Sequence, residues 1–226
     1  MNNRLKTIIS HVSDGVGIID VGTDHGYLPA ELAQRGYRGN IFASDVNAAP
    51  LDAARRTAEK AGVISSIQFL HCDGLALCPP EDVDTIVIAG MGGDLICRIL
   101  DMAEWCMDSR YKLILQPMTK PEVLRYWLTN NEFEICSESL TEDAGMIYQI
   151  FTARFGGKTQ LRDAELFTGA YKMLGNDPLF PKILNRFIAR FEKSAAGLQR
   201  AKDAPVGRLE LINEILSQLK EMSSYD

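Results

Sequence analysis

Short apolar runs alternate with segments of helical periodicity over the first two thirds of the chain. The runs have the length and composition of buried strands, and they predict strands at residues 16–21, 40–46, 66–72, 84–89 and 111–115. Apolar residues at helical spacing predict helices at residues 5–12, from Tyr27 onward, and at 48–61, 94–107 and 120–130. Residues 133–155 alternate around a turn and predict a hairpin of strands 133–140 and 146–155. This order predicts an α/β fold whose parallel sheet is closed by an antiparallel edge.

The last third of the chain is helical in pattern throughout. Two sets of apolar residues recur at heptad-like spacing, namely Phe180, Leu184, Phe187, Phe191 and Leu198, and then Leu209, Ile212, Leu216 and Leu219. Two helices of this kind, joined by a short turn, form an antiparallel coiled-coil-like hairpin. We therefore expect two domains, an α/β domain of residues 1–157 and an all-α domain of residues 158–226.

The composition is that of a globular protein, because 46% of the 226 residues are apolar and can form a sizeable core. No window approaches the roughly 18–20 uninterrupted apolar residues of a membrane span, and the N-terminal segment does not resemble a signal peptide. The five cysteines form no C-x-x-C pair and the three histidines are scattered, so neither a disulfide framework nor a metal site is expected. We expect a cytoplasmic protein without a membrane partner, and the sequence is compatible with a monomer.

The net charge of −6 is distributed unevenly between the two predicted domains. Residues 1–157 hold 13 Lys/Arg against 21 Asp/Glu, a balance of −8, whereas residues 158–226 hold 11 against 9, a balance of +2. An acidic α/β domain is not typical of nucleic-acid binding, which usually requires a basic surface. If a polyanion binds this protein, the C-terminal domain is expected to help hold it.

The segment from Val16 to Pro29, VGIIDVGTDHGYLP, has the pattern of a strand, a glycine-bearing turn and a helix. Such a unit lets a ligand lie against bare backbone at the carboxyl edge of a sheet. The glycines do not fit the G-x-G-x-x-G spacing of a dinucleotide site, and Asp24 occupies the position of its second glycine. Acids at Asp20 and Asp24 suit a positively charged ligand without phosphate, such as S-adenosylmethionine. The alternative is a tight turn with solvated acids.

Acidic residues also follow the next two predicted strands. Asp45 ends the second strand about 20 residues after the glycine turn, where an acid accepts hydrogen bonds from ribose hydroxyls. Asp73 and Gly74 follow the third strand, where an acid can bind the adenine amino group and a glycine leaves room for the ring. Taken alone, each of these acids could instead be an ordinary cap at the end of a strand. Three acids at one sheet edge together favour a nucleoside-binding site.

The overall order, five strand–helix units and then a hairpin, resembles class I S-adenosylmethionine-dependent methyltransferases. Five segments narrow the resemblance: DVGTDHGYLP (20–29), SDV (44–46), CDGL (72–75), IAGMGG (88–93) and LQP (115–117). Together they are similar to the TrmK family of bacterial tRNA methyltransferases, which methylate N1 of the adenine at position 22 of tRNA. The resemblance extends over residues 1–157 and continues more loosely through the tail. The pairing of DVGTDHGYLP with AGMGG is its most specific part.

The resemblance implies a cofactor site for S-adenosyl-L-methionine at the strand ends. Asp20 with the turn glycines would hold the methionine end, Asp45 the ribose, and Asp73 the adenine. The full set of cofactor-binding residues would be Asp20, Gly22, His25, Gly26, Asp45, Asp73, Gly74, Gly90 and Gly92. Gly90–Gly92 stand where many amino-group methyltransferases place an Asn/Asp-Pro-Pro-aromatic clamp, and the absence of this clamp argues against methylation of an exocyclic amine.

The resemblance also suggests residues that act on the target base. Adenine N1 carries an in-plane lone pair, so placement of the base supplies most of the acceleration, and a carboxylate can stabilise the cationic product or accept the N6 proton. The candidate catalytic residues are Asp24 for that carboxylate, Tyr27 for stacking on the unpaired base, and Met91 near the reacting group. His25 would help shape the target pocket. Tyr27 could equally be a core aromatic, and His25 a turn residue.

A basic stripe in the tail supplies the candidate contacts to tRNA. Its residues, spaced 4, 4 and 3 apart so that they share one helix face, are Lys182, Arg186, Arg190 and Lys193. They either form a solvated face or hold tRNA phosphates, and Gln116 is a further candidate for the substrate. Two other hypotheses remain: a class I methyltransferase acting on a small molecule or a protein, and a non-enzymatic nucleoside-binding or RNA-chaperone module. The intact Asp20, Asp45 and Asp73 argue against the second.

Overall fold

A computed structural model describes residues 2–201 and 205–224 of the chain. The chain divides into two compact units, Met1–Thr159 and Gln160–Asp226, and each unit is described by itself. This division lies two residues beyond the boundary that the sequence predicts at 157/158.

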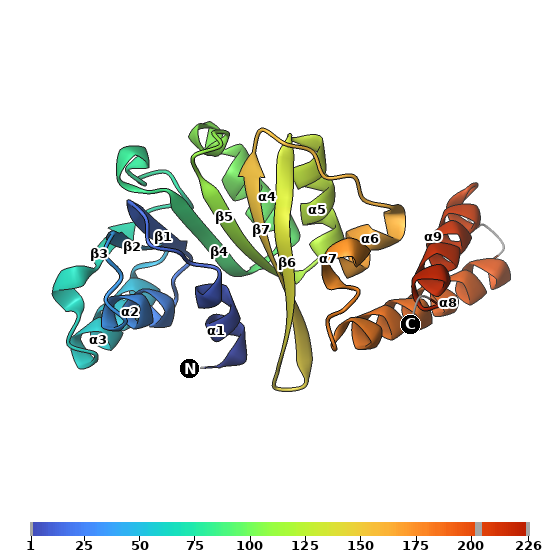
Figure 1. Cartoon of the computed structure of the whole chain (residues 1–226), viewed down its shortest axis with the longest axis horizontal. Helices are drawn as coiled ribbons and strands as arrows, with labels where there is room; N and C mark the ends of the chain where they lie inside the picture. The colour runs from blue at the N-terminus through green and yellow to red at the C-terminus, as the bar shows by residue number, and fades with distance from the viewer. Residues whose placement is uncertain (1, 202–204, 225–226) are drawn as a thin grey trace. The chain divides into compact units, whose positions relative to one another are not determined.

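The first unit contains a seven-stranded sheet in the order β3-β2-β1-β4-β5-β7-β6 (Figure 1). Its strands are β1 (Gly17–Val21), β2 (Asn40–Asp45), β3 (Gln68–His71), β4 (Thr85–Gly92), β5 (Lys112–Thr119), β6 (Phe133–Asp143) and β7 (Met146–Phe155). The first five strands pair in parallel, and β7 pairs antiparallel with both β5 and β6. The antiparallel strand therefore lies inside the sheet, and β6 rather than β7 forms the edge.

Strands β4 and β5 extend beyond their predicted ends at Ala89 and Leu115. Met91 pairs with Pro117 and Gly92 with Thr119, across register shifts after Ala89 and Met91. The predicted end of the fourth strand at Ala89 is wrong, because a bulged strand can include glycines that a regular strand disfavours.

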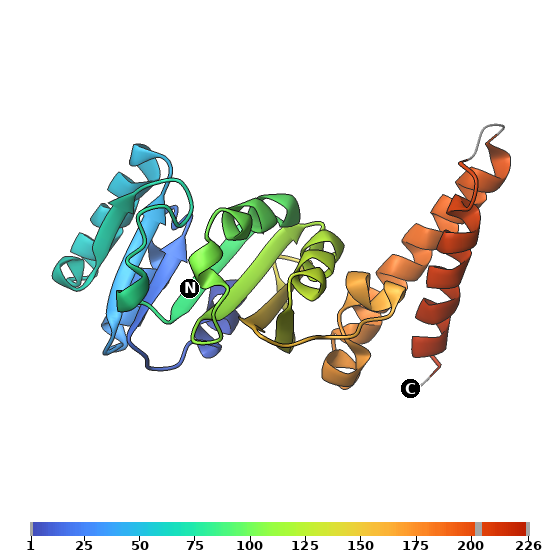
Figure 2. The same ribbon diagram turned by 90° about the horizontal axis from the view of Figure 1, so that it is seen from above.

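Helices cover both faces of the sheet. On one face lie α1 (Asn3–Ser10), α2 (Tyr27–Gln34) and α3 (Ala48–Lys60), where Ile8, Leu28 and Ala58 pack in one cluster with strand residues such as Ile18 and Val87. The opposite face is covered by α4 (Gly93–Asp101) and α5 (Pro121–Asn130), which contact each other and strands β4, β5 and β6 (Figure 2). Neighbouring residues of a strand point to opposite faces of the sheet. Because helices cover both faces, every residue of β1 is buried.

The helix predicted at residues 94–107 is shorter than expected. It ends at Asp101, and a separate 3-10 turn, η3 (Glu104–Cys106), follows it. Two further 3-10 turns, η1 (Ile64–Ser66) and η2 (Pro80–Asp82), precede β3 and β4. Helix α1 begins at Asn3 because the Asn2 side chain caps it by accepting a hydrogen bond from the Leu5 amide at 2.9 Å.

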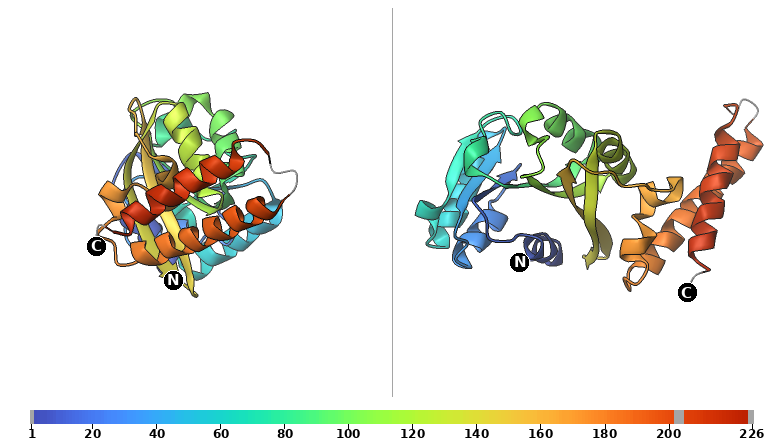
Figure 3. Two further views of the ribbon diagram at one scale, coloured as in Figure 1. Left: turned by 90° about the vertical axis from the view of Figure 1, so that its right-hand side faces the viewer. Right: turned by 45° about the horizontal axis from the view of Figure 1, so that its top comes forward.

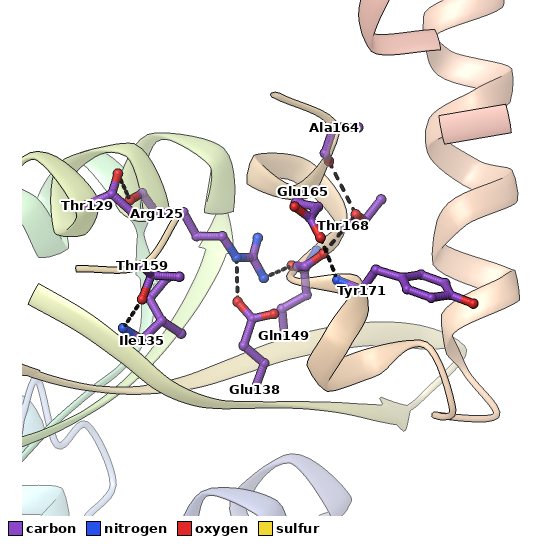
Figure 4. Close-up of polar contacts among 11 residues, drawn as sticks. Arg125, Thr129, Ile135, Glu138, Gln149, Thr159, Ala164, Glu165, Thr168 and Tyr171 are labelled. Carbon is purple, nitrogen blue, oxygen red and sulfur yellow. Dashed lines mark hydrogen bonds and ion pairs between the residues drawn. The ribbon is translucent and has the colours of Figure 1, made fainter. Parts of the chain in front are cut away.

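A buried ion pair joins α5 to the β6–β7 hairpin (Figure 4). Arg125 donates from Nε to Glu138 Oε1 at 2.7 Å and from Nη2 to Gln149 Oε1 at 2.6 Å. Its guanidinium also lies 4.4 Å from the centre of the Phe151 ring. The side chains of Arg125 and Glu138 are 0% and 1% exposed, so each depends on its partner for compensation of its charge.

The second unit consists of helices. These are α6 (Asp163–Thr168), α7 (Tyr171–Leu174), α8 (Phe180–Arg200) and α9 (Arg208–Met222). Figure 3 shows α8 and α9 side by side from two directions, and the two helices contact each other. Their buried residues differ from the predicted heptads. On α8, Ile183 and Ala195 are buried and Leu198 is not. On α9, Ile215 and Met222 are buried, whereas Leu209 and Leu216 are not.

Within residues 2–201 and 205–224, no helix combines the length and the apolar character needed to cross a membrane. In the same described ranges, no cluster of three or more His, Cys, Asp or Glu side chains is arranged to hold a metal ion.

Candidate active site

Two cavities lie where strands β1, β2 and β4 end, at the carboxyl edge of the parallel part of the sheet. The Asp45 cavity, about 260 Å³, is bordered by residues at the ends of β1, β2 and β3 and by α4. The Tyr27 cavity, about 330 Å³, is bordered by residues of α1, β1, α2, β4 and the β6–β7 hairpin. Both cavities include Gly22, so they adjoin at the turn after β1. This edge is where ligands bind in open α/β sheets.

The Asp45 cavity combines acids with an apolar wall. Asp45 and Asp73 line it together with Gly74, and Leu95 and Ile99 supply apolar surface from α4. Asp45 is 9% exposed, and its Oδ1 accepts a hydrogen bond from the Asn47 amide at 2.9 Å, which fixes the carboxylate at the start of α3. The predicted juxtaposition of Asp45, Asp73 and Gly74 is therefore present in the structure.

The turn between β1 and α2 brings the backbone close to both cavities. Gly22 and Gly26 adopt φ values of +70° and +68°, in the left-handed region that favours glycine. A Cβ atom on Gly22 would lie 2.1 Å from the Met91 methyl group, so Met91 packs directly over this glycine. Met91 lines the Asp45 cavity and is absent from the lining of the Tyr27 cavity.

Asp20 lies at the floor of the Tyr27 cavity and is 7% exposed. Burial raises the pKa of its carboxyl group to about 6, and the nearby charge of Asp45 acts in the same direction. The Thr23 hydroxyl, which donates to Asp20 Oδ2 at 2.7 Å, and the charge of Arg4 oppose this rise of the pKa. Above pH 6 the site therefore holds a buried negative charge, which suits a cationic ligand group.

The burial of the Asp20 carboxylate is also expected to destabilise the folded protein when the group is charged. We expect Asp20→Asn to raise the free energy of unfolding at pH 8 by on the order of 3 kcal/mol, because the pKa rises from 3.8 to about 6 on folding. A raised folded-state pKa means that the stability contributed by the protonated carboxyl is complete below pH 3.8 and is lost as the pH rises through 6. Urea unfolding at pH 4 and pH 8 tests this, and an equal gain at both pH values would contradict it.

The Tyr27 cavity also contains exposed polar and aromatic groups. Tyr27 is 56% exposed, and its ring centre lies 5.7 Å from that of His25, which argues against a core role for Tyr27. Asp24 adopts φ of +51°, and its carboxylate lies 3.7 Å from His25 Nε2. Asp24, His25 and Tyr27 thus lie together at one cavity, as the sequence predicts.

Arg4, at this cavity, and its buried partner Gln116 have roles that the sequence does not reveal. Arg4 of α1 lines the cavity, and its Nη1 donates to Gln116 Oε1 at 2.9 Å. Gln116, a predicted substrate contact, is 0% exposed and lines neither cavity; it holds Arg4 instead. No local pattern identifies Arg4, because it lies outside the strand-end segments and meets Gln116 across 112 residues of sequence.

The remaining predicted residues are distributed as follows. Gly90, with φ of +83°, lines the Tyr27 cavity, whereas Gly26 and Gly92 line neither cavity. Gly26 lies against Ala54 of α3, because a Cβ there would stand 2.7 Å from the Ala54 Cβ, and Gly92 precedes α4. In the second unit, the basic stripe lies on α8, and all four of its residues, Lys182, Arg186, Arg190 and Lys193, are exposed.

Comparison with known proteins identifies the class to which this fold and site belong. Residues 1–151 match the family described as "Methyltransferase domain". The match includes β1–β5 and both cavities. The chain therefore belongs to the methyltransferase-domain family, with a Rossmann-like fold.

Relatives that match over nearly the whole chain identify the family more narrowly. The tRNA (adenine(22)-N(1))-methyltransferase of Bacillus subtilis (strain 168) is 26% identical over 230 residues, which cover 96% of this chain and 97% of the relative. The crystal structure of the B. subtilis M1A22 tRNA methyltransferase TrmK matches with a TM-score of 0.87 at 26% identity over 98% of both chains. A Streptococcus pneumoniae candidate tRNA (m1A22) methyltransferase, crystallised with S-adenosyl-L-methionine, is 32% identical over 97% of both chains, with a TM-score of 0.77. The chain is a member of the TrmK family.

Proposed function

We propose that this protein transfers a methyl group from S-adenosyl-L-methionine to N1 of the adenine at position 22 of tRNA. The observation that carries the proposal is the similarity to the B. subtilis tRNA (adenine(22)-N(1))-methyltransferase over 96% of the chain. Two adjoining cavities that meet at Gly22 support it, because the reaction requires a cofactor and a target base in contact.

The Asp45 cavity fits the adenosine half of the cofactor. Asp45 would accept hydrogen bonds from the two ribose hydroxyls and Asp73 one from the adenine amino group. Gly74, at φ of +55°, keeps this wall open, since a Cβ there would approach Ile99 to 3.1 Å. Asp20 would hold the ammonium of the methionine end. The bound cofactor supplies an electrophilic methyl group on a sulfonium.

The Tyr27 cavity fits the target adenine. The exposed Tyr27 ring would stack on a base taken out of its helix, which leaves N1 on the Watson–Crick edge accessible. The N1 lone pair would form the new N–C bond with the methyl group that the cofactor supplies, and the electron pair of the broken S–C bond would stay on sulfur. Asp24 borders the cavity and would stabilise the positive charge of the methylated base or accept its N6 proton.

Met91 and Gly90 support a ring-nitrogen target. They belong to the bulged end of β4, where no Asn/Asp-Pro-Pro-aromatic clamp stands. Met91 packs over Gly22 at the junction of the two cavities, so its thioether would border the transferred methyl group. Its role would therefore be to limit the positions that the methyl group can occupy.

The exposed basic stripe on α8 would hold tRNA phosphates. Changing Arg186 and Arg190 together to glutamate is expected to raise the KM for tRNA at least tenfold, with little change in the affinity for the cofactor, because the stripe lies outside the cofactor unit. Steady-state kinetics at two salt concentrations measure this effect. The control is Glu192→Lys, which adds positive charge to α8 and should not raise KM. An unchanged KM for the double variant would show that the stripe is a solvated surface that does not bind tRNA.

Methyl transfer from labelled S-adenosylmethionine to unmodified bacterial tRNA tests the proposed activity. The expected product, after digestion to nucleosides, is labelled 1-methyladenosine with the wild type and none with Asp20→Ala. Labelled tRNA with another modified nucleoside would refute the assignment to N1.

A class I methyltransferase acting on a small molecule or a protein is the second candidate. The observation that favours it is the −8 charge of residues 1–157, which does not suit binding of a polyanion. Cofactor binding without any labelling of tRNA would select this candidate.

The packing of α8 against α9 supports an antiparallel coiled-coil-like hairpin as the tRNA-binding part of the second unit. The cytoplasm, where tRNA is modified, is the compartment that the proposed substrate implies. We also propose that a single chain suffices for activity, since this chain supplies the acids of the Asp45 cavity as well as the exposed aromatic group and carboxylates of the Tyr27 cavity.

A further inference from the structure

A third cavity lies beside the Tyr27 cavity, among helices α1, α2 and α3. This Gln34 cavity has a volume of about 320 Å³, and its lining includes Leu5, Ala30, Glu31, Gln34, Thr57 and Ala61. Asn2, Leu5 and Tyr27 line both this cavity and the Tyr27 cavity, so the two cavities adjoin. Among the described residues, none lines both the Gln34 cavity and the Asp45 cavity. The Gln34 cavity is therefore next to the proposed target site and separate from the proposed adenosine site.

The Gln34 cavity combines apolar surface with polar groups. Ala30, which is 4% exposed, and the half-buried Leu5 and Ala61 supply the apolar surface. Gln34 is exposed, and its Nε2 donates to the Ala61 carbonyl at 3.3 Å, so its amide keeps a second N–H and an acceptor oxygen for a ligand. Apolar surface with a few polar groups is typical of small-ligand sites and suits a flat heteroaromatic ring.

The charge of the lining argues against a phosphate in this cavity. Glu31 is the one charged side chain among the described residues that line it. Its Oε1 accepts from Arg35 Nε at 2.9 Å, and the carboxylate has a second oxygen that can accept further hydrogen bonds. A carboxylate repels a phosphate but accepts hydrogen bonds from the amino groups of a base. The cavity therefore suits a neutral nucleobase.

Tyr27 connects the two adjoining cavities. Its ring is 56% exposed and forms part of the lining of both. A target base that leaves its stack also deprives the neighbouring base of a stacking partner, which adds to the cost of extrusion. Stacking of that neighbour on an aromatic side chain compensates for this loss. A site for the neighbouring base must adjoin the site for the target base, because the two nucleotides are covalently linked, and the Gln34 cavity meets this requirement.

We propose that the Gln34 cavity binds the nucleobase next to the target adenine in the same tRNA. The inference rests on the proposed function, because the neighbour is defined by the target base in the Tyr27 cavity. Glu31 and Gln34 hydrogen-bond to the edge of this second base, and Tyr27 lies between the two bases. The surface formed by α1, α2 and α3 thus recognises a second position of the substrate.

Removal of single bases from the substrate tests the inference. Two tRNA transcripts each lack one base, immediately before or immediately after the adenine at position 22. We expect the loss of one of these two bases to lower kcat/KM of the wild type about tenfold. Ala61→Trp, which fills the Gln34 cavity, should lower kcat/KM for complete tRNA by a similar factor and then respond less than about twofold to loss of that base.

Two further variants make this test specific. Glu59→Trp adds the same ring at an exposed position of α3 outside the described lining, and it should respond to base loss as the wild type does. Gln34→Ala removes a polar group from the cavity without adding volume, and it provides the same comparison if Ala61→Trp does not fold. Thermal unfolding checks the fold of each variant, and calorimetry should show unchanged affinity for S-adenosylhomocysteine.

Two results would overturn the inference. One is a wild type whose kcat/KM is the same with and without either neighbouring base. The other is a loss of the base that lowers kcat/KM of Ala61→Trp and Gln34→Ala as much as that of the wild type, because independent effects place the base elsewhere. If the wild type does not methylate complete tRNA, the proposed function itself fails. That result is distinct, since failure of the Gln34 cavity alone leaves the methylation of complete tRNA intact.

Discussion

Replacing Asp45 with alanine should weaken binding of S-adenosylhomocysteine by about 100-fold or more. The carboxylate stands at the end of β2 in the Asp45 cavity and is 9% exposed, so its hydrogen bonds to a ligand form with little competition from water. Two charge-assisted hydrogen bonds to ribose hydroxyls, each worth about 1.5–3 kcal/mol, account for a loss of this size. Isothermal titration calorimetry on the purified variant measures it.

Two further variants separate the ligand contact from other effects of the substitution. Asp52→Ala removes an exposed carboxylate from α3 and should bind the ligand as the wild type does. Asp45→Asn keeps an oxygen that can accept the Asn47 amide hydrogen bond but loses the charge, and we expect an intermediate affinity. Wild-type affinity in Asp45→Ala would show that the nucleoside does not bind at the end of β2.

Replacing Glu138 with alanine should lower the free energy of unfolding by about 3–5 kcal/mol. The reason is that Arg125, 0% exposed, would lose the carboxylate that its Nε contacts at 2.7 Å and would keep a buried charge. Urea unfolding followed by circular dichroism gives the difference. Because the pair joins α5 to the β6–β7 hairpin, far from β1 and β2 in the strand order, cofactor affinity should change little in the folded variant.

An exposed ion pair in the same unit provides the matched control. Arg35 Nε lies 2.9 Å from Glu31 Oε1, and the two side chains are 51% and 29% exposed, respectively. Arg35→Ala removes this ion pair and should lower the free energy of unfolding by less than about 1 kcal/mol. The double variant Arg125→Met with Glu138→Leu should recover much of the stability, because both charges are then absent. A loss at Glu138→Ala no larger than that at Arg35→Ala would refute a stabilising role for the buried pair.

Much of the fold and of the cofactor site follows from local sequence patterns. A parallel sheet brings the carboxyl ends of its strands to one edge, so acids that follow successive apolar runs must lie near one another. This geometry places Asp20, Asp45 and Asp73 around the two adjoining cavities. The turn glycines can also be predicted from the sequence. Gly22 and Gly26 adopt a positive φ, a backbone conformation that few other residues adopt.

Features that depend on distant contacts could not be predicted in the same way. Strand β4 continues through Gly90–Gly92 only because β5 pairs with it beyond Leu115, and glycine-rich segments have no strand pattern of their own. Gln116 follows a predicted strand and looks available to a substrate, yet it is buried and holds Arg4 from α1. Such contacts are set by the packing of the whole unit, which periodicity does not encode.

Methylation of two tRNA transcripts that differ only at position 22 tests the central claim most directly. One transcript carries adenine at this position and the other guanine, and both are incubated with the protein and S-adenosylmethionine before digestion to nucleosides. The account predicts 1-methyladenosine from the adenine transcript and none from the guanine transcript. Equal amounts from both transcripts, or a methyl group on N6 rather than N1, would contradict it.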